Sequence, residues 1–240
     1  MTIAYNTSIV TSGLVLSLDA ANTKSYPGVG TVWADLSGNG RNGTLTNGPT
    51  YSSSNSGSIV FDGTNDYTEF GDVLDAGTNS FTVNVWARPT ALTASNYNIT
   101  VSKAFLFVGN FRWAVGFFNG FMASFMQGNS APDVEPRGSS SIALNTWAMF
   151  TYVFNRSSSV SMYLNGNLET LTGSATISQW NGLDFNSTHP FRVGSYTSSD
   201  NIGTTLNFSG NISNVHMYNR ILSASEISQN FNALRGRYGI

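Results

Sequence analysis

Hydrophobic residues in this chain recur mostly at every second position, in short runs separated by Gly, Asn, Ser and Pro. Such alternation is typical of β-strands that bury one face. In residues 13–20, for example, Leu14, Leu16 and Leu18 share one face. The strands predicted from this pattern cover residues 13–20, 58–61, 67–70, 80–88, 112–118, 121–126 and 147–154. The pattern therefore predicts many short antiparallel strands.

Two Asn-Gly pairs mark expected β-hairpins, because Asn and Gly tolerate the two positive φ angles of a type I′ turn. Asn119-Gly120 joins the strands predicted on either side of it, and Asn165-Gly166 forms a second turn. Residues 147–154 are apolar on both faces, as expected for a central strand of a two-layer sandwich.

Residues 22–51 contain several Asn-Gly pairs and two prolines, and we expect them to be mostly loop, anchored by Trp33 and Leu36. No internal repeat with a period of about 20–50 residues is evident, which argues against a propeller or a solenoid. A length of 240 residues fits one all-β sandwich domain.

The chain is expected to end with a strand, a turn and a capped helix. The strand would bury Ile212, Val215 and Met217, and its polar positions are Asn211, Ser213, Asn214 and His216. Ser223 and Glu226 have the spacing of a capping box, so the helix should begin at Ala224. Its apolar face, expected to cover the sandwich edge, comprises Ile227, Phe231 and Leu234.

Charged residues make up 10% of the chain, against about 25% in ordinary globular proteins, so Ser, Thr, Asn and Gly must cover the surface. The net charge of −2 and the 11 scattered basic residues disfavour binding to nucleic acid or to an anionic membrane. Cysteine is absent, which excludes disulfides. No apolar run is long enough to span a bilayer, and no signal peptide is evident. Residues 1–12 are predicted to be a polar N-terminal arm, and residues 13–240 the domain.

Catalytic residues are not expected. A glycosidase needs two carboxylates on opposite sides of the scissile bond, and no predicted strand pairs two acids at i and i+2. Asp133 and Glu135 are flanked by prolines and are interpreted as a solvated acidic turn. His189 and His216 are interpreted as surface or hydrogen-bonded structural residues, because no nucleophile elbow or acidic metal partners accompany them.

Three segments carry a family resemblance: FSGNISNVHMYNRILSASEI from residue 208, SIVFDGTNDY from residue 58, and NTW at residue 145 with YLNG at residue 163. They resemble laminin-G-like and pentraxin-like jelly rolls of the concanavalin A-like lectin and glucanase superfamily. The resemblance covers roughly residues 14–234. It implies an all-β, two-sheet antiparallel jelly-roll sandwich with one short C-terminal helix.

The resemblance also implies a calcium site, but the usual ligand positions are depleted. Ser195 follows Gly194 where pentraxins carry acids, and Ser213 stands where many relatives have an aspartate. A weaker candidate metal cluster comprises Asp62, Asp66, Asp72 and Asp75. No cofactor is required by the sequence, and calcium is the one candidate.

Sugar binding needs aromatic platforms beside amide or carboxylate groups. Two loops that match the pentraxin ligand rim provide such groups, namely Asn96, Tyr97 and Asn98 on one and Tyr196 and Asp200 on the other. The second candidate platform is Trp86 with Arg88, on the face of residues 80–88 that is opposite to the core.

Residues 13–22, 33–40, 43–45 and 230–240 resemble laminin-G-like structural proteins of tailed bacteriophages. The resemblance implies a non-catalytic virion protein, a capsid decoration or tail fibre protein that binds host-surface polysaccharide. Such a protein would be made in the host cytoplasm without a signal peptide, would contact other virion proteins through its arm, and is compatible with a homo-oligomer. Two alternatives remain, a secreted or cell-surface lectin and a polysaccharide-degrading enzyme.

Overall fold

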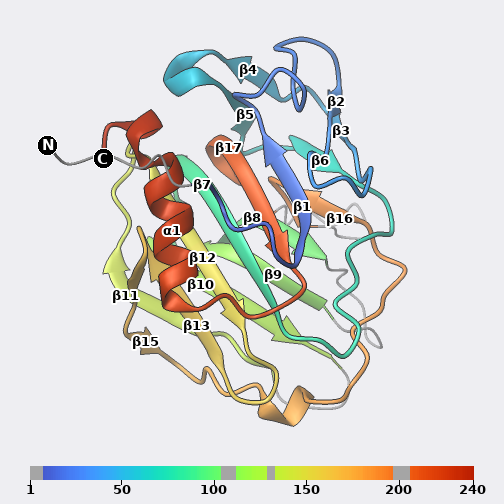
Figure 1. Ribbon diagram of the computed structural model, residues 1–240. Helices are drawn as coiled ribbons and strands as arrows, with labels where there is room; N and C mark the ends of the chain where they lie inside the picture. The colour runs from blue at the N-terminus through green and yellow to red at the C-terminus, as the bar shows by residue number, and fades with distance from the viewer. Residues whose placement is uncertain (1–7, 104–111, 129–132, 197–205) are drawn as a thin grey trace, which may run out of the picture.

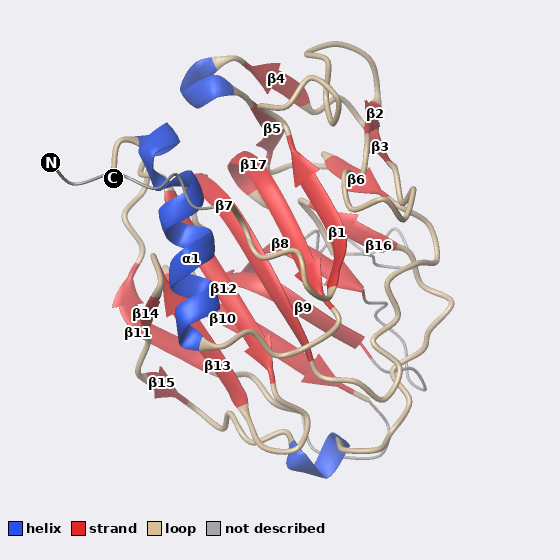
Figure 2. Ribbon diagram, viewed as in Figure 1, coloured by secondary structure: helices blue, strands red, loops and turns tan. Residues whose placement is uncertain are grey.

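The computed structural model describes residues 8–103, 112–128, 133–196 and 206–240. Two antiparallel β-sheets pack face to face, and one α-helix, α1 (Ala224–Leu234), lies across the outer face of one sheet (Figure 1). The remaining helices are short 3₁₀ turns, η1 (Ser54–Ser56), η2 (Ser178–Trp180) and η3 (Arg235–Tyr238) (Figure 2). The predicted all-β sandwich with one short C-terminal helix is confirmed.

The first sheet contains, in order, β14 (Asn167–Leu168), β13 (Val160–Leu164), β12 (Ala148–Phe154), β7 (Phe81–Ala91), β17 (Ser209–Tyr218), β5 (Ser58–Asp62) and β4 (Thr50–Ser52), and β1 (Leu14–Asp19) also pairs with β17. The second sheet contains β15 (Leu171–Thr172), β11 (Arg137–Ser141), β10 (Phe121–Gln127), β9 (Arg112–Phe118), β8 (Tyr97–Lys103), β16 (Phe191–Val193), β6 (Tyr67–Glu69), β3 (Gly43–Thr46) and β2 (Val32–Trp33). Strands from distant parts of the chain are therefore neighbours in both sheets.

The main hydrophobic core fills the space between the sheets. Trp113 on β9 reaches Phe81 of the first sheet and Phe191 of the second, with ring centroids 5.0 and 6.1 Å apart. Trp33 is fully buried in this core, as expected, but Leu36 is 37% exposed and does not anchor its segment. Residues 22–51 also contain the short strands β2 and β3 and most of β4.

Both predicted hairpins are present. Asn119 and Gly120 have φ angles of 51° and 85°, and Asn165 and Gly166 have φ angles of 52° and 81°. These are the two consecutive positive values that a type I′ turn requires. Local turn chemistry therefore fixes both hairpins.

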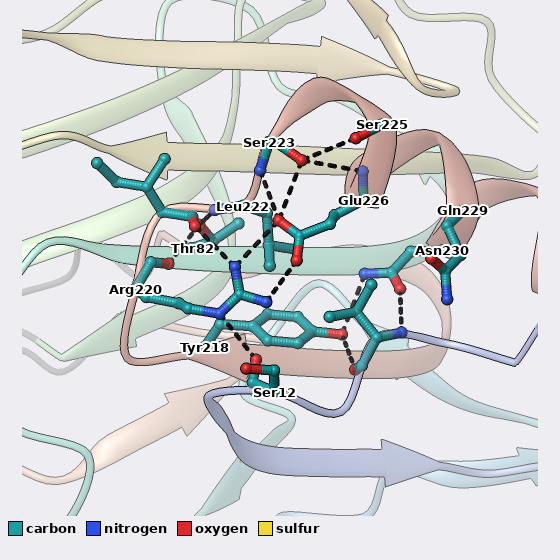
Figure 3. A network of polar contacts seen from close by, with 12 residues as sticks. Ser12, Thr82, Tyr218, Arg220, Leu222, Ser223, Ser225, Glu226, Gln229 and Asn230 are labelled. Carbon is teal, nitrogen blue, oxygen red and sulfur yellow. Dashed lines mark hydrogen bonds and ion pairs between the residues drawn. The ribbon is translucent and has the colours of Figure 1, made fainter.

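The capping box at the start of α1 is confirmed. The Ser223 hydroxyl accepts from the Glu226 backbone N–H, and the Glu226 carboxylate accepts from the Ser223 N–H at 2.9 Å (Figure 3). Arg220 reinforces the cap, with its NH2 2.6 Å from the Glu226 Oε1. The helix begins at Ala224, as predicted.

The helix covers the outer face of the first sheet and not its edge, which corrects the prediction. Ile227, Phe231 and Leu234 belong to a second hydrophobic cluster that includes Trp86 of β7 and Tyr218 of β17. Outward-facing residues of the central strands are therefore buried in a third layer (Figure 2).

Residues 8–12 of the predicted arm pack against the domain. Val10 is 7% exposed, its N–H donates to Asn230 Oδ1 at 2.8 Å, and its carbonyl accepts from the Tyr218 hydroxyl at 3.0 Å (Figure 3). The Ser12 carbonyl accepts from Arg220 Nε at 2.9 Å. These contacts place residues 8–12 with the folded domain, while residues 1–7 lie outside the described residues.

Candidate functional site

A row of aromatic side chains lies on the outer face of the second sheet. We define this aromatic row as Tyr196 after β16, Phe125 on β10, Tyr97 on β8 and Phe118 at the end of β9. Successive ring centroids are 5.4 Å, 5.4 Å and 4.9 Å apart. Four segments that are separate in sequence thus form one continuous aromatic cluster, in which Phe125 and Tyr196 are buried and Tyr97 and Phe118 are half-buried.

Strand alternation places the row on this face. Trp113 and Phe117 of β9 and Met122 and Met126 of β10 belong to the main core, so the residues between them point outward. The outward residues between Phe118 and the far end of these strands are small, Ala114, Gly116 and Ala123. The larger rings cover them, since Ala114 and Ala123 are both fully buried.

Gly116 sets how closely β8 approaches β9. A Cβ at this position would lie 2.2 Å from the Asn98 carbonyl oxygen and 2.9 Å from the Ile99 Cα. Only glycine therefore allows the bulged segment of β8, between Ile99 and Val101, to pair with β9. This pairing brings Tyr97 to Phe118.

A chain of polar groups borders the aromatic row. The Tyr97 hydroxyl donates to Glu135 Oε2 at 3.0 Å. Gln127 Nε2 donates to Asp133 Oδ2 at 2.7 Å and to Glu135 Oε1 at 3.4 Å, and Arg112 Nε donates to Gln127 Oε1 at 2.6 Å. Acids, amide and guanidinium thus lie beside aromatic rings on one surface.

The segment with Asp133 and Glu135 differs from the solvated turn that we expected. Val134 between them is 2% exposed and exchanges two backbone hydrogen bonds of 3.0 Å with Met126 of β10. This pairing turns Val134 inward and both acids toward Gln127. The two flanking prolines do not prevent this pairing, and the Pro136 carbonyl accepts from the Ser124 N–H of β10 at 3.3 Å.

A cleft of about 290 Å³ opens at the hairpin end of the aromatic row, and we call it the hairpin cleft. Its lining includes Phe118, Phe121, Arg137, Ser139 and Thr172. The Arg137 guanidinium lies 3.7 Å from the centre of the Phe118 ring and 3.9 Å from the Glu135 carboxylate. The cleft combines flat apolar surface with hydrogen-bonding groups.

The two tyrosines of the aromatic row remain protonated near neutral pH. Burial, and then the Glu135 carboxylate, raise the pKa of Tyr97 well above its usual value of 10. Burial raises the pKa of Tyr196 to about 12, although Arg112 acts in the opposite direction. Both hydroxyls can therefore act as hydrogen-bond donors.

The structure brings together one residue from each of the two predicted ligand loops, since Tyr97 and Tyr196 both contact Phe125. Asn96 and Asn98 play local roles. Asn96 Oδ1 accepts from the Tyr97 N–H, and Asn98, 2% exposed, accepts from the Thr93 N–H. Asp200 lies outside the described residues.

The prediction for Trp86 and Arg88 is corrected. Trp86 is 1% exposed and stacks on Tyr238 and Phe231 at 4.2 and 5.8 Å, so α1 and η3 cover it. Arg88 Nε donates to the Asn145 carbonyl at 3.0 Å. Trp86 is a packing residue, because the face opposite to the core is buried by the C-terminal helices.

The four aspartates of the predicted metal cluster form two separate pairs. Asp66 Oδ2 accepts from the Asp62 N–H at 3.0 Å, and Asp62 caps the following turn. Asp72 and Asp75 lie 2.9 and 3.1 Å from the buried ammonium of Lys103. Within the described ranges, no three His, Asp or Glu side chains group as metal ligands. The second pair already balances a cation, and calcium binding stays a prediction.

Sequence reasoning missed most of the polar border and the rings nearest the cleft. The missed residues are Arg112, Phe118, Phe121, Phe125, Gln127, Asp133, Glu135 and Arg137. One signal was available for four of them. Arg112, Phe118, Phe121 and Phe125 occupy outward positions of one predicted hairpin, where aromatic and basic side chains are unusual.

The histidines lie away from this face or in the protein interior. His216, expected at the surface or in a hydrogen bond, is 3% exposed on the outer face of the first sheet. Burial lowers its pKa to about 4, and among charged groups Asp19 opposes this shift and Arg237 adds to it. His189 is 7% exposed, and burial followed by Lys103 lowers its pKa as well.

We expect stability to fall on mild acidification because of His216. The unfolded chain takes up a proton near pH 6.5 that the folded protein binds only near pH 4. The contribution of His216 to stability is therefore fully present above pH 6.5 and is lost progressively as the pH falls toward 4. At about 1.4 kcal/mol per pKa unit, the free energy of unfolding should be roughly 2 kcal/mol lower at pH 5 than at pH 7. Urea unfolding of the wild type and of His216→Gln measures this. An equal pH slope in both proteins would exclude His216 as the cause, and His189→Gln measures the contribution of the other histidine.

The two sheets and the helix that covers one of them define a lectin-like jelly-roll domain. The chain belongs to the concanavalin A-like lectin/glucanases superfamily, whose family model matches residues 62–228. A search of curated protein sequences finds no match. None of the helices in the described parts of the chain has the length and hydrophobicity needed to cross a membrane.

Solved structures share this fold at low sequence identity. The binding domain of Paraclostridial Mosquitocidal Protein 1 has a TM-score of 0.71 at 18% identity, over 92% of this chain and 52% of that one. The receptor-binding domain of botulinum neurotoxin D has a TM-score of 0.67 at 14% identity, over 92% of this chain and 52% of that one. This chain thus spans about half of each toxin domain. Domain 4 of the arabinanase AbnA from Geobacillus stearothermophilus was solved with arabinotriose. It has a TM-score of 0.67 at 19% identity, over 91% of this chain and 98% of that one.

Proposed function

We propose that this domain binds carbohydrate without cleaving it, at the aromatic row and the hairpin cleft on the outer face of the second sheet. The observation that carries the proposal is the contact of half-buried Tyr97, Phe118 and Arg137, which pack on the buried rings of Phe125 and Tyr196 at spacings of 3.7 to 5.4 Å, beside Glu135 and Gln127. Sugars present apolar C–H faces that pack on rings and hydroxyls that need amides and acids.

The structural relatives support a sugar ligand to different degrees. The arabinanase domain matches over 98% of its own length and was solved with arabinotriose, so the whole of a sugar-complexed domain has this fold. The toxin domains match over about half their length, and their receptor contacts need not lie in the matched half. The arabinanase domain is therefore the more informative comparison.

Binding to a glycan array, followed by calorimetry with the best ligand and with arabinotriose, tests the proposal. Phe118→Ala should weaken binding at least about tenfold, because it removes the ring that joins the row to the cleft. Leu168→Ala is the matched control, since Leu168 is 65% exposed on β14 of the other sheet. Unfolding temperature and circular dichroism verify the fold of both variants. Equal affinity in Phe118→Ala and wild type would place the ligand elsewhere.

The biological setting proposed for this binding is a bacteriophage particle, and it is supported by the sequence resemblance alone. We propose that the domain decorates a head or forms part of a fibre, binds polysaccharide of the host surface, and attaches through residues preceding Ser8. Mass spectrometry of purified particles from a lysate would detect the protein. Its absence from particles would favour a secreted or cell-surface lectin.

Cleavage of polysaccharide is the second candidate, and one observation favours it. Asp133 and Glu135 both accept a hydrogen bond from Gln127 Nε2, which brings two carboxylates close together beside the aromatic row. Release of reducing ends from a bound polysaccharide, abolished by Glu135→Gln, would establish an enzyme. Binding without release of reducing ends would support the non-catalytic function.

A further inference from the structure

A second cleft lies on the opposite side of the molecule, on the outer face of the first sheet. It has a volume of about 410 Å³ and opens between β1, β17 and the C-terminal end of α1. Ser17, Asp19, Asn214 and His216 form its polar wall, and Leu36 and Leu234 are among its apolar residues. No part of it is shared with the hairpin cleft. We call it the β1–β17 cleft.

The amide of Asn214 gives the cleft an unused buried donor. Asn214 is 1% exposed, and its Oδ1 accepts from the Tyr238 hydroxyl at 2.7 Å and from Arg237 NH1 at 3.3 Å. These two bonds fix the orientation of the amide. Its Nδ2 has no hydrogen-bond partner among the described residues. Leaving a buried amide unpaired is costly, so a ligand that accepts from Nδ2 would gain binding energy; because Nδ2 itself is fully buried, binding must be accompanied by a shift of the side chains that cover it.

His216 and Ser17 continue this wall as part of a polar row across four strands. Ser17 lies opposite His216, His216 opposite Asn84, and Asn84 opposite Thr151. Directly opposed residues share one face of a sheet. All four are buried, and Asn84 Oδ1 and Nδ2 and the Thr151 hydroxyl also have no partner within the described part of the chain. These side chains therefore have more hydrogen-bond donors and acceptors than they use among themselves.

The wall is polar but electrically balanced. Asp19 is held by both terminal nitrogens of Arg237, at 2.8 and 3.1 Å. The His216 imidazole is uncharged near neutral pH because burial lowers its pKa. A charged ligand would find no free countercharge in this wall, whereas neutral hydroxyl groups can both donate to and accept from amide, imidazole and hydroxyl groups.

We propose that the β1–β17 cleft is a second binding site, specific for a small uncharged polyhydroxylated molecule, a monosaccharide or polyol. Its hydroxyls accept from Asn214 Nδ2 and pair with His216 and Ser17, and its C–H surface packs against Leu36 and Leu234. The volume is in the range of small-molecule sites. This inference does not rest on glycan binding at the aromatic row.

Titration followed by NMR of the imidazole resonances tests the proposal, because the chain contains only two histidines. The probes are arabinose, glucose, galactose, mannose and glycerol at millimolar concentrations. We expect a saturable shift of the His216 resonances with at least one probe and none at His189. Absence of a saturable His216 shift with all five probes overturns the proposal.

Blocking variants separate this site from the aromatic row. Leu36→Trp fills the rim of the cleft and should weaken binding of the probe, measured by the His216 titration, at least about tenfold. Ala233, on α1, also lines the cleft, and Ala233→Phe narrows it from that side. This variant replaces Leu36→Trp in the experiment if Leu36→Trp is unstable. Phe118→Ala should leave the titration unchanged even where it abolishes glycan-array binding. A shift that persists in both blocked variants, or that disappears in Phe118→Ala, contradicts a site at this cleft.

Discussion

Trp86→Ala is expected to lower the free energy of unfolding by about 3–5 kcal/mol, the usual cost of removing a buried tryptophan. The ring is 1% exposed and joins the first sheet to both C-terminal helices. It stacks on Tyr238 of η3 at an interplanar angle of 18° and on Phe231 of α1 at 8°. Its loss leaves a cavity beneath two elements at once, so the C-terminus should also become accessible to protease before the sandwich unfolds.

Urea unfolding and limited proteolysis measure these effects. Trp86→Phe is the matched control, because it retains an aromatic ring and removes an indole N–H that has no partner among the described residues. It should cost clearly less than Trp86→Ala and leave glycan binding unchanged. A Trp86→Ala variant with wild-type stability that has lost glycan binding would contradict a packing role and restore the sequence-based interpretation as a sugar platform.

Removal of residues 1–12 is expected to destabilise the domain by roughly 2–5 kcal/mol. Part of this loss is the burial of Val10, and the larger part comes from two buried groups that lose partners, at about 1–3 kcal/mol each. These groups are Asn230 Oδ1, which accepts from the Val10 N–H, and the Tyr218 hydroxyl, which donates to the Val10 carbonyl. Asn230 and Tyr218 are 1% and 0% exposed in the intact chain, and their mutual hydrogen bond of 3.0 Å does not replace the two bonds to Val10.

The matched control is a chain that begins at Ser8, which keeps every contact described for residues 8–12 and should unfold like the full chain. Thermal and urea unfolding compare the three proteins. Equal stability of all three would show that residues 8–12 are a free arm, as the sequence suggested. The shorter deletion is also the correct tool for testing attachment to a particle, because it separates an interaction role from a folding role.

The elements that sequence predicted well depend on residues close together in the chain. The hairpins at Asn119 and Asn165 and the cap at Ser223 require only a few neighbouring residues to satisfy their geometry. Predictions failed where burial depends on a distant element. Leu36 is partly exposed, and Trp86 is covered by a helix that begins 138 positions later in the numbering, at Ala224.

The structure brings together two of the predicted ligand residues, and ligand binding by them stays a prediction. Tyr97 and Tyr196 lie near each other because β8 and β16 are adjacent strands of one sheet, and the family resemblance had placed both residues on one ligand rim. Phe125, which joins them, comes from a third strand, and Glu135 comes from a segment whose Val134 and Pro136 form backbone hydrogen bonds with β10. Nothing in the spacing of these residues along the chain indicates that they meet.

By itself, the sequence determined the architecture of this protein: an all-β sandwich, its two Asn-Gly hairpins, a capped C-terminal helix and membership of a lectin-like family. Alternation of side chains, turn conformations and capping are short-range properties, and a single chain displays them directly. Only the tertiary structure decided which polar and aromatic groups share a surface. Strand order brings together the aromatic row on one sheet, and on the other sheet it places Ser17, His216, Asn84 and Thr151 in one line. Side-chain alternation sets only which face a residue occupies, and whether that face is open or covered depends on elements elsewhere in the chain.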